Sequence, residues 1–180
     1  MSAYQEVLQF WFEEIEPKQY WVKDTEFDSM IIERFADTHR QAAQCELYEW
    51  RQTAQGRLAE IIVLDQFSRN MFRDQPESFA SDAQALVLAQ EAVSLKADQE
   101  LNKQQKTFLY MPYMHSESLK VHEQAVKLFT ENAIQENLDF EIRHKVIIER
   151  FGRYPHRNAI LGRESTQAEL EFLQQPGSGF

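Results

Sequence analysis

The chain has 180 residues, 43% of them apolar and 27% charged, which is enough sequence for one globular domain with a substantial core. The net charge of −10 argues against nucleic acid or an anionic membrane as the main partner, and no segment approaches the ~20 uninterrupted apolar residues of a membrane-spanning helix. A single cysteine, Cys45, excludes an intrachain disulfide, and the N-terminus lacks the features of a signal peptide, so we expect a cytoplasmic protein.

Apolar side chains spaced three and four residues apart predict helices in the first half of the chain. The predicted helices cover residues 4–15, about 25–44 with a cap at Asp24 or Thr25, and about 54–70. Trp21, in the connection between the first two, is expected to be buried. The third helix is apolar nearly all round, so we expect it in the middle of the protein.

Caps and helix breakers mark the helices of the second half. Ser81 and Gln84 form a capping-box pattern that opens a fourth helix. A fifth helix runs to about Met111, where Pro112 is expected to break or kink it. The remaining predicted helices cover about 116–133, about 140–151 with Gly152 as a left-handed end, 155–162, and a short last helix after a capping box of Thr166 and Glu169.

The pattern predicts an all-α fold of about eight helices in a single domain, residues 1–180. No segment shows a sustained two-residue alternation, and five glycines and five prolines are too few for the many tight turns of an all-β fold. Antiparallel helix pairs of similar length would suit a tetratricopeptide-like right-handed superhelix. A closed orthogonal bundle is the alternative.

A carboxylate interrupts the apolar face of the third helix. Asp65 lies in the centre of the face that Leu58 and Ile61 define, and Arg69 follows one turn later. Because a buried charge is normally paired, Asp65 is expected to bond Arg69 or an arginine from elsewhere. The other interpretation is a polar site lined by Asp65, Arg69, Asn70 and Arg73.

Histidines lie on the apolar faces of the later helices. His122 and His144 are expected to be core residues with satisfied nitrogens, and His115 shares the face of His122 if that helix extends backwards. A spacing of seven residues puts His115 and His122 ~10 Å apart, too far for one ion. With no cysteine cluster and no phosphate loop, we expect neither a metal nor a cofactor. Ser116, beside His115, is expected to cap a helix rather than act as a nucleophile.

Three stretches carry a family resemblance: LDQFSRNMFRD (64–74), FLYMPYMHSESL (108–119) and RFGRYPHRNAILGREST (150–166). Together they resemble a bacterial family, domain of unknown function 924, of the tetratricopeptide-like helical superfamily. The resemblance covers nearly the whole chain and implies an all-helical, superhelical fold, but no reaction. Ser68 stands where the family pattern has proline and His122 where it has glutamine, which argues against a catalytic role for His122.

The motif residues allow three interpretations. In the first, Arg153, Arg157 and Arg163 pair with Asp65, Glu117 or Glu123 and hold the C-terminal segment on the central helix. In the second, which is our working hypothesis, the motifs line a concave groove that binds an anionic small molecule or a peptide carboxylate. In the third, Asp65, His115 and His156 perform acid–base chemistry of a hydrolase type. The ligand-binding set of the second is Asp65, Arg69, Asn70, Arg73, His115, Glu117, Arg153, His156, Arg157, Asn158 and Arg163.

Overall fold

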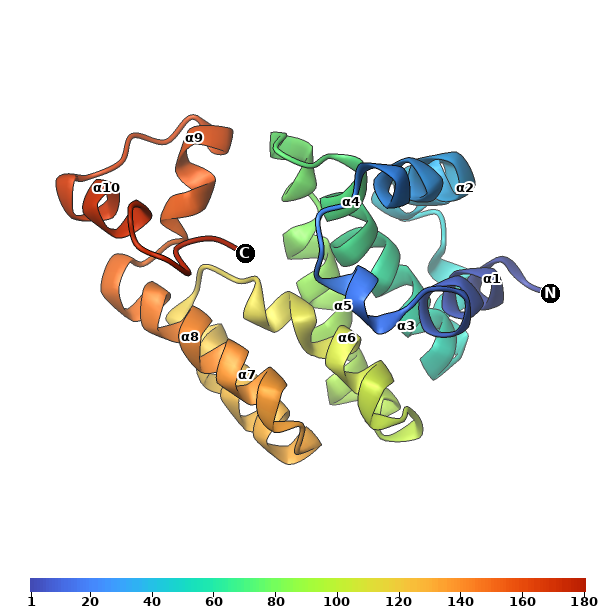
Figure 1. The fold of residues 1–180 in the computed structure, drawn as a ribbon. Helices are drawn as coiled ribbons and strands as arrows, with labels where there is room; N and C mark the ends of the chain where they lie inside the picture. Colours follow the sequence, from blue (N-terminus) through green and yellow to red (C-terminus); the bar gives the residue numbers. More distant parts are fainter.

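Every regular element of the chain is helical, which confirms the predicted all-α class (Figure 1). The computed structural model describes residues 1–180. The α-helices are α1 (Ala3–Gln9), α2 (Thr25–Ala43), α3 (Ala54–Ile62), α4 (Ser68–Met71), α5 (Asp82–Ser94), α6 (Lys103–Met114), α7 (Leu119–Asn132), α8 (Gln135–Phe151), α9 (Asn158–Leu161) and α10 (Gln167–Leu173). The π turns are η1 (Phe10–Glu14) and η4 (Val63–Phe67), and the 3₁₀ turns are η2 (Pro17–Tyr20), η3 (Tyr48–Gln52), η5 (Pro76–Ser78), η6 (Ala97–Glu100) and η7 (Pro155–Arg157).

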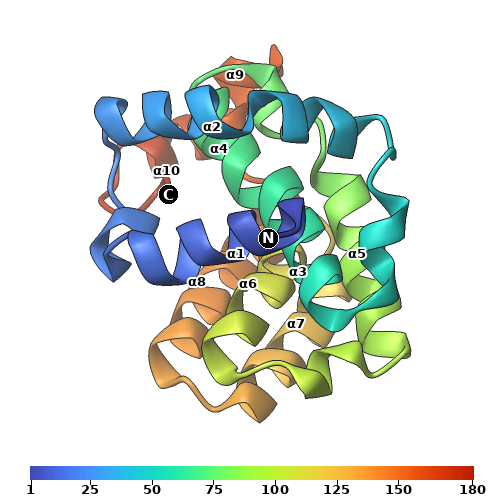
Figure 2. The same cartoon turned by 90° about the vertical axis from the view of Figure 1, so that its right-hand side faces the viewer.

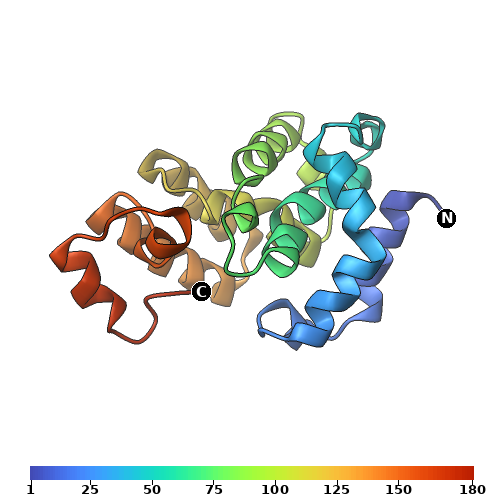
Figure 3. The same cartoon turned by 90° about the horizontal axis from the view of Figure 1, so that it is seen from above.

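The helices form two lobes that join along α6, α7 and α8. The N-terminal lobe contains α1–α6 and the C-terminal lobe α7–α10, and α7 packs against both α6 and α8. Figure 1 and the view from above in Figure 3 show α9 and α10 standing apart from α4 and α5, with the C-terminus between them. Figure 2 shows α1 and α2 lying across the outer side of the N-terminal lobe. The right-handed tetratricopeptide-like superhelix and the single-domain boundary stay predictions.

The central helix of the N-terminal lobe lies where the sequence pattern predicts it. The segments α3, η4 and α4 follow one another without a break over residues 54–71. Leu58, Ile61 and Ile62 have no exposed surface, and α1, α5 and α6 all pack against α3. A helix that is apolar on every side loses least when other helices surround it, and this one is surrounded.

The π turn η4 sits in the middle of this central helix. The Ser68 hydroxyl donates to the Leu64 carbonyl over 2.6 Å, while the Ser68 backbone N–H is bonded to the Gln66 carbonyl. Position 68 therefore stands outside the regular α-helical ladder, and a proline, which has no N–H, would remove no i→i−4 bond there.

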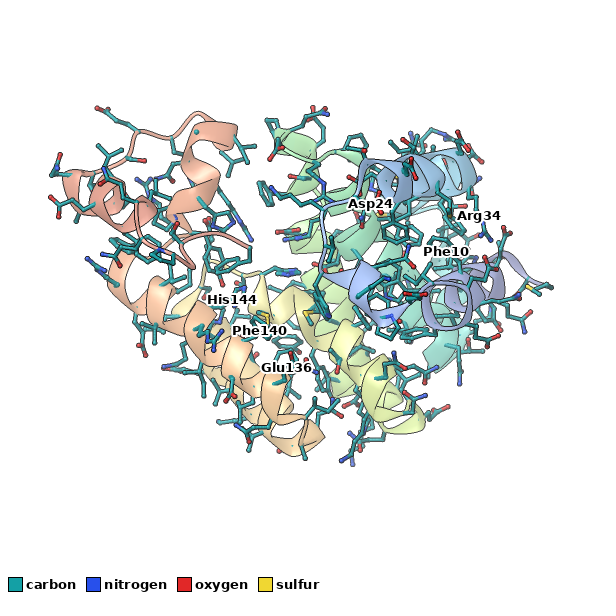
Figure 4. The ribbon with its side chains drawn as sticks, viewed as in Figure 1. Phe10, Asp24, Arg34, Glu136, Phe140 and His144 are labelled. Carbon is teal, nitrogen blue, oxygen red and sulfur yellow. The ribbon has the colours of Figure 1, made fainter.

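Aromatic rings tie the first helix to the central one. Phe10 lies 6.0 Å from Phe67 between ring centroids, Trp11 lies 5.6 Å from Phe67, and the Arg34 guanidinium covers the Phe10 ring at 4.7 Å (Figure 4). A regular three-four spacing that starts at Tyr4 would bury Phe12 rather than Phe10, but Phe10 is fully buried and Phe12 only partly. The π turn η1 rotates the face by less than 100° per residue, which the periodicity could not reveal.

The prediction that Trp21 is buried was wrong. Its side chain is 61% exposed. It follows the 3₁₀ turn η2 at the surface and stacks one face on Phe108, with centroids 5.9 Å apart and planes at 12°. The turn is too short to carry the indole into the core, which Trp11 already fills.

Several predicted ends of helices are confirmed. Asp24 caps α2 by accepting from the backbone N–H of Glu26 at 2.9 Å. Gly152 and Gly162 end their helices in the left-handed region, with φ of 71° and 67°. Thr166 and Glu169 form the capping box of α10.

Other predicted caps and ends differ in the structure. The helix α5 does begin after Ser81, as predicted, but the Ser81 side chain makes no cap, and Gln84 donates to the Ala42 carbonyl of α2 at 2.9 Å instead. The helix α6 continues through Pro112 to Met114. His115 ends α6 and so does not lie on α7, whose N-cap is Ser118 rather than the expected Ser116. The helix α8 begins at Gln135, five residues before the predicted start.

The different surroundings of the two tryptophans predict different losses of stability. Trp11→Ala should lower the free energy of unfolding by about 3–5 kcal/mol, because it opens a large cavity against Phe67 and Phe108. Trp21→Ala should cost less than about 1 kcal/mol, because most of its surface is already in water. Urea unfolding of both variants would measure this, and equal losses would contradict the assignment of Trp21 to the surface.

Candidate functional site

The three polar motifs meet where the two lobes face each other. The first (64–74) ends the central helix, the second (108–119) ends α6 and leads into α7, and the third (150–166) runs from the end of α8 through α9. Hydrogen bonds link the first motif to the second and the second to the third, two of them between side chains and one from a side chain to a backbone carbonyl. We call one group of these residues, with a carboxylate from α5, the inter-lobe cluster: Asp65, Arg69, Asp82, His115 and Arg157.

Asp65 is the buried centre of the cluster and has no exposed surface. Its Oδ1 accepts from His115 Nδ1 at 2.7 Å, and its Oδ2 accepts from Gln66 Nε2 at 2.8 Å. The predicted pair with Arg69 is present but longer, 3.4 Å to Oδ1. Burial works to raise the pKa of Asp65, but His115 and Arg69 outweigh it and lower the pKa. Asp65 is therefore a carboxylate at neutral pH.

His115 presents one ring nitrogen to Asp65 and leaves the other free. Asp65 can only accept, so the His115 proton lies on Nδ1. The Nε2 atom has no hydrogen-bond partner and is not enclosed, and the side chain is 15% exposed. Burial and the charge of Arg69 lower the pKa of His115, against the opposing effect of Asp65. The imidazole is thus neutral at pH 7, with a lone pair on an accessible Nε2.

Arg69 connects the central helix to the start of α5. Its guanidinium donates two bonds to Asp82, of 2.8 and 3.0 Å, and a third of 3.1 Å to the Asp65 carbonyl. Burial opposes the charge of Arg69, but Asp82 and Asp65 raise its pKa above the usual value. Arg69 is a fully paired cation.

Arg157 crosses from the C-terminal lobe to the N-terminal lobe and is only 6% exposed. Its guanidinium lies between two rings, 4.5 Å from the Phe79 centroid and 4.7 Å from that of Tyr154. Its Nη2 donates to the His115 carbonyl at 2.9 Å, its Nη1 is 3.6 Å from Asp82, and its Nε has no partner. Burial and the charge of Arg69 lower the pKa of Arg157. This cation is poorly compensated.

His156 lies beside Arg157 but has no carboxylate partner. Its Nδ1 is enclosed and unbonded, and its ring packs edge-on against Phe180 with centroids 4.8 Å apart. Phe180 also stacks on His144, one turn after Phe140 on α8, at 3.8 Å (Figure 4). Burial is the main cause that lowers the pKa of His156 to about 4 and that of His144 to about 3. Of the three predicted acid–base residues, the structure joins Asp65 and His115 only.

Three motif residues form ion pairs within the C-terminal segment and its link to α6, and a fourth forms hydrogen bonds to both pairs. Arg163 grips Glu117 with bonds of 2.8 and 2.9 Å, as one interpretation of the sequence predicted. Arg153 grips Glu169 instead, with bonds of 2.9 and 2.8 Å. Asn158 bonds both systems, accepting from Arg163 and donating to Glu169. Glu123 makes no ion pair with any of them, and the carboxylate nearest Arg157 is Asp82.

Arg73 and Asn70 lie apart from the inter-lobe cluster. Both bond Asp28 of α2, Arg73 over 2.7 and 2.9 Å and Asn70 over 2.8 Å. Asp28 was missed from the sequence, although it stands three residues before the buried Ile31 and so shares its face. These residues hold the end of the central helix to α2.

A second histidine–carboxylate pair lies beneath the cluster and is closed on all sides. His122 Nδ1 is 2.6 Å from Glu141 Oε1, and His122 Nε2 is 2.7 Å from the Ser116 carbonyl. The Tyr154 hydroxyl lies 3.0 Å from the same Nε2 and donates to the Met114 carbonyl at 2.6 Å. Neither His122 nor Glu141 has exposed surface, and burial raises the pKa of Glu141. Both ring nitrogens are engaged, as expected for a core histidine.

Two surface hollows lie away from the inter-lobe cluster. One, of about 640 Å³, runs along α1 and includes Tyr4 and Leu8, and the other, of about 550 Å³, lies between α7 and α8. No group of three or more His, Cys, Asp or Glu side chains is arranged to hold a metal ion. None of the helices combines the length and apolar character needed to cross a membrane.

The Arg153–Glu169 pair predicts an acid-dependent part of the stability. Arg153 is the main cause that lowers the pKa of Glu169 far below its usual value. A carboxyl whose pKa is lower in the folded chain stabilises the fold above its unfolded pKa of about 4.3 and loses that contribution as the pH falls. Glu169→Gln should therefore cost about 1–3 kcal/mol at pH 7, and this difference from wild type should shrink between pH 5 and pH 3.

Urea unfolding at several pH values would measure this dependence. Glu164→Gln is the matched control, because the Glu164 side chain is exposed and only its backbone carbonyl meets Arg153. A Glu169→Gln difference that stays constant from pH 7 to pH 3 would contradict the prediction.

A family model and a solved structure each match nearly the whole chain. The family model for a bacterial protein of unknown function (DUF924) matches residues 7–177. The structure of a protein of unknown function, ATU0120, from Agrobacterium tumefaciens is 36% identical in sequence, with a TM-score of 0.90 over 95% of this chain and 96% of that one. No curated protein matches the chain. The chain therefore belongs to the bacterial DUF924 family.

Proposed function

We propose that the protein binds an anionic small molecule or a peptide carboxylate at the inter-lobe cluster, with Arg157 as the main anion-binding residue. One observation carries the proposal. Arg157 is nearly buried, yet it has one hydrogen bond and an Nε without a partner, and its nearest carboxylate, Asp82, lies 3.6 Å away and accepts two bonds from Arg69. A guanidinium held in this way is short of acceptors, and burying an under-compensated cation is unfavourable. An anionic ligand would supply the missing acceptors.

Other arginines of the same chain support this interpretation. In Arg51, Arg73 and Arg153, the edge formed by Nε and Nη2 grips one carboxylate with two bonds. In Arg157 the same edge has a single bond, to the His115 carbonyl. Carboxylate and phosphate oxygens both fit this edge. The free donor of this edge is Nε, and it therefore lies on the side of Arg157 that faces His115.

The other motif residues divide between binding and support in this proposal. Arg69 adds positive charge next to Arg157, and His115 and His156 lie beside them. Glu117, Arg153, Asn158 and Arg163 hold the segment that carries Arg157, while Asn70 and Arg73 hold the central helix. A structural network, the first interpretation of the sequence, is thus supported for these six residues. The binding interpretation is supported for the remaining five: Asp65, Arg69, His115, His156 and Arg157.

Entry to this site requires a small movement. The Nε atom is enclosed, and the ring of Phe79 covers one face of the guanidinium. Phe79 lies between η5 and α5, in a connection with little regular structure. We further infer a tetratricopeptide-like stacking of the helix pairs, because such stacks present concave surfaces between neighbouring pairs.

The proposal predicts that Arg157 matters for binding and Arg163 for stability. Titration calorimetry with inorganic phosphate and with N-acetylglycine, a minimal peptide carboxylate, should detect binding of at least one of them to the wild-type chain. Arg157→Met should weaken that binding at least tenfold, about 1.4 kcal/mol. It should leave the melting temperature unchanged or raised, because it removes a poorly compensated buried cation.

Arg163→Met is the matched control, since its two bonds to Glu117 are complete. It should cost about 1–3 kcal/mol of stability, which at this length corresponds to roughly 2–4 °C per kcal/mol, and should bind the anion as the wild type does. Binding that is equal in Arg157→Met and wild type, or absent from the wild type at millimolar anion, would overturn the proposed function.

A further inference from the structure

We propose that His115 is a general base, oriented by Asp65, which activates water for hydrolysis of an ester or amide whose anionic group is bound by Arg157. The inference rests on the proposed anion site and adds a reaction to it. Its basis is the contrast between the two histidine–carboxylate pairs of the molecule. In one pair both histidine nitrogens are occupied. In the other one nitrogen is free, on a residue whose ring feels the charge of Arg69 and whose backbone carbonyl accepts from Arg157.

The geometry around His115 is that of an oriented base. Asp65 has no exposed surface and is itself held by Gln66, so the carboxylate cannot turn away from the ring. The 2.7 Å bond from Nδ1 to Asp65 fixes both the tautomer and the ring orientation. The position of His115 at the end of α6 fixes its backbone. The free Nε2 is thus the only polar atom of the ring that can act on a bound molecule.

A purely structural role for His115 explains the bond from Nδ1 to Asp65 but not the free Nε2. A side chain that only tied α6 to the central helix would need a single donor, which an asparagine amide supplies. In the other histidine–carboxylate pair, Glu141 and the Ser116 carbonyl use both nitrogens of His122, and no surface remains exposed. His115 keeps an accessible lone pair, which is the property that a general base requires.

No protein nucleophile lies next to His115. Ser116 follows it in sequence, but its hydroxyl accepts from the backbone N–H of Ser118 at 3.2 Å and makes no bond to the ring. Cys45 is exposed and lies near Gln84. In this proposal water is therefore the nucleophile and an acyl carbon is the electrophile, because the positive charges of Arg69 and Arg157 favour the oxyanion that forms at an attacked carbonyl.

The reaction balances without another reactant. His115 Nε2 takes a proton from water as the water oxygen bonds to the carbonyl carbon, and the C=O electron pair moves onto oxygen. Collapse of this intermediate restores the C=O bond and breaks the bond to the leaving oxygen or nitrogen, which takes the proton from Nε2. The products are a carboxylic acid and an alcohol or amine. Nδ1–H stays bonded to Asp65 throughout, and the carboxylate stabilises the transient imidazolium.

The charged groups around His115 set the pH range. Asp65 favours its protonation, Arg69 disfavours it, and Asp82 and Arg157 lie just beyond. Burial has the largest effect and, together with Arg69, lowers the pKa of His115 against Asp65, so the base is already deprotonated at neutral pH. The rate should rise with pH and level off below about 6.5, the ordinary value for histidine.

Two model esters test the inference: p-nitrophenyl acetate, which is neutral, and p-nitrophenyl hemisuccinate, which carries a carboxylate. The wild-type chain should hydrolyse the anionic ester above the buffer rate and faster than the neutral one. His115→Asn keeps a donor for Asp65 but removes Nε2, and should lower kcat/KM roughly 100-fold or more. His122→Gln is the control: it changes the closed pair and should leave the rate unchanged.

A second measurement keeps the test decisive if His115→Asn does not fold. Diethyl pyrocarbonate should modify His115 of the wild-type chain and abolish hydrolysis, hydroxylamine should restore it, and peptide mass analysis should find His122 unmodified. Hydrolysis that survives modification of His115 or its replacement by asparagine, or no hydrolysis of either ester, overturns the general-base role. Phosphate or N-acetylglycine binding that still depends on Arg157 would then leave the anion site standing. If the wild-type chain binds neither phosphate nor N-acetylglycine, but its hydrolysis of the neutral ester still depends on His115, the anion site would be overturned and the general base would stand.

Discussion

A carboxylate without exposed surface, Asp65, lies in the middle of the buried central helix, and its charge must be balanced from within the protein. The π turn η4 contains it, and His115, Gln66 and Arg69 supply the donors. Each donor has consequences further out. His115 can reach Asp65 only because α6 runs past Pro112 and ends beside the central helix, and Arg69 requires Asp82 at the start of α5. The burial of one charge thus organises three helices.

The joint between the lobes continues this sequence of contacts. Asp82 is paired with Arg69 and faces Arg157 at a longer distance, while Arg157 reaches the His115 carbonyl from the C-terminal lobe. The ion pairs on either side of this joint are complete: Arg163 with Glu117, Arg153 with Glu169 and Arg73 with Asp28. At the joint itself, the pairing of Arg157 is incomplete. Arg69, Arg73, Arg153 and Arg163 each grip a carboxylate, whereas the nearly buried Arg157 has one hydrogen bond and an Nε without a partner. In the proposed function, Arg157 therefore has capacity to bind further acceptors.

The cations of the third motif therefore have two different tasks in an otherwise acidic chain. Arg153 and Arg163 hold the segment from η7 to α10 in place, and Arg157 uses that rigid support to present a guanidinium between two rings. The neutral imidazole of His115 stands at the same joint with its outer nitrogen free. Positive charge to hold an anion and a lone pair to move a proton are the two ingredients that the proposed binding and hydrolysis need. The supporting ion pairs, which look structural taken one at a time, place both.

Much of the fold could be read from the sequence, because local rules govern it. The all-α class, the buried central helix, the caps at Asp24 and Thr166, and the glycine ends at 152 and 162 all follow from apolar spacing or from the demands of a few neighbouring backbone groups. Asp65 was recognisable as special because a charge on an apolar face is conspicuous, and the family motifs supplied Arg157 and His115.

The sequence could not predict which side chains of different helices contact one another. Asp82 looked like an ordinary first-turn residue, Tyr154 and Phe79 like ordinary aromatics, and Trp21 like a core residue. The pairing of His115 with Asp65, 50 residues away, and the missing partner of Arg157 depend on how α5, α6 and the C-terminal segment pack together. Periodicity along a chain tells which side of a helix is buried, but the distance between two side chains on different helices exists only once those helices have packed.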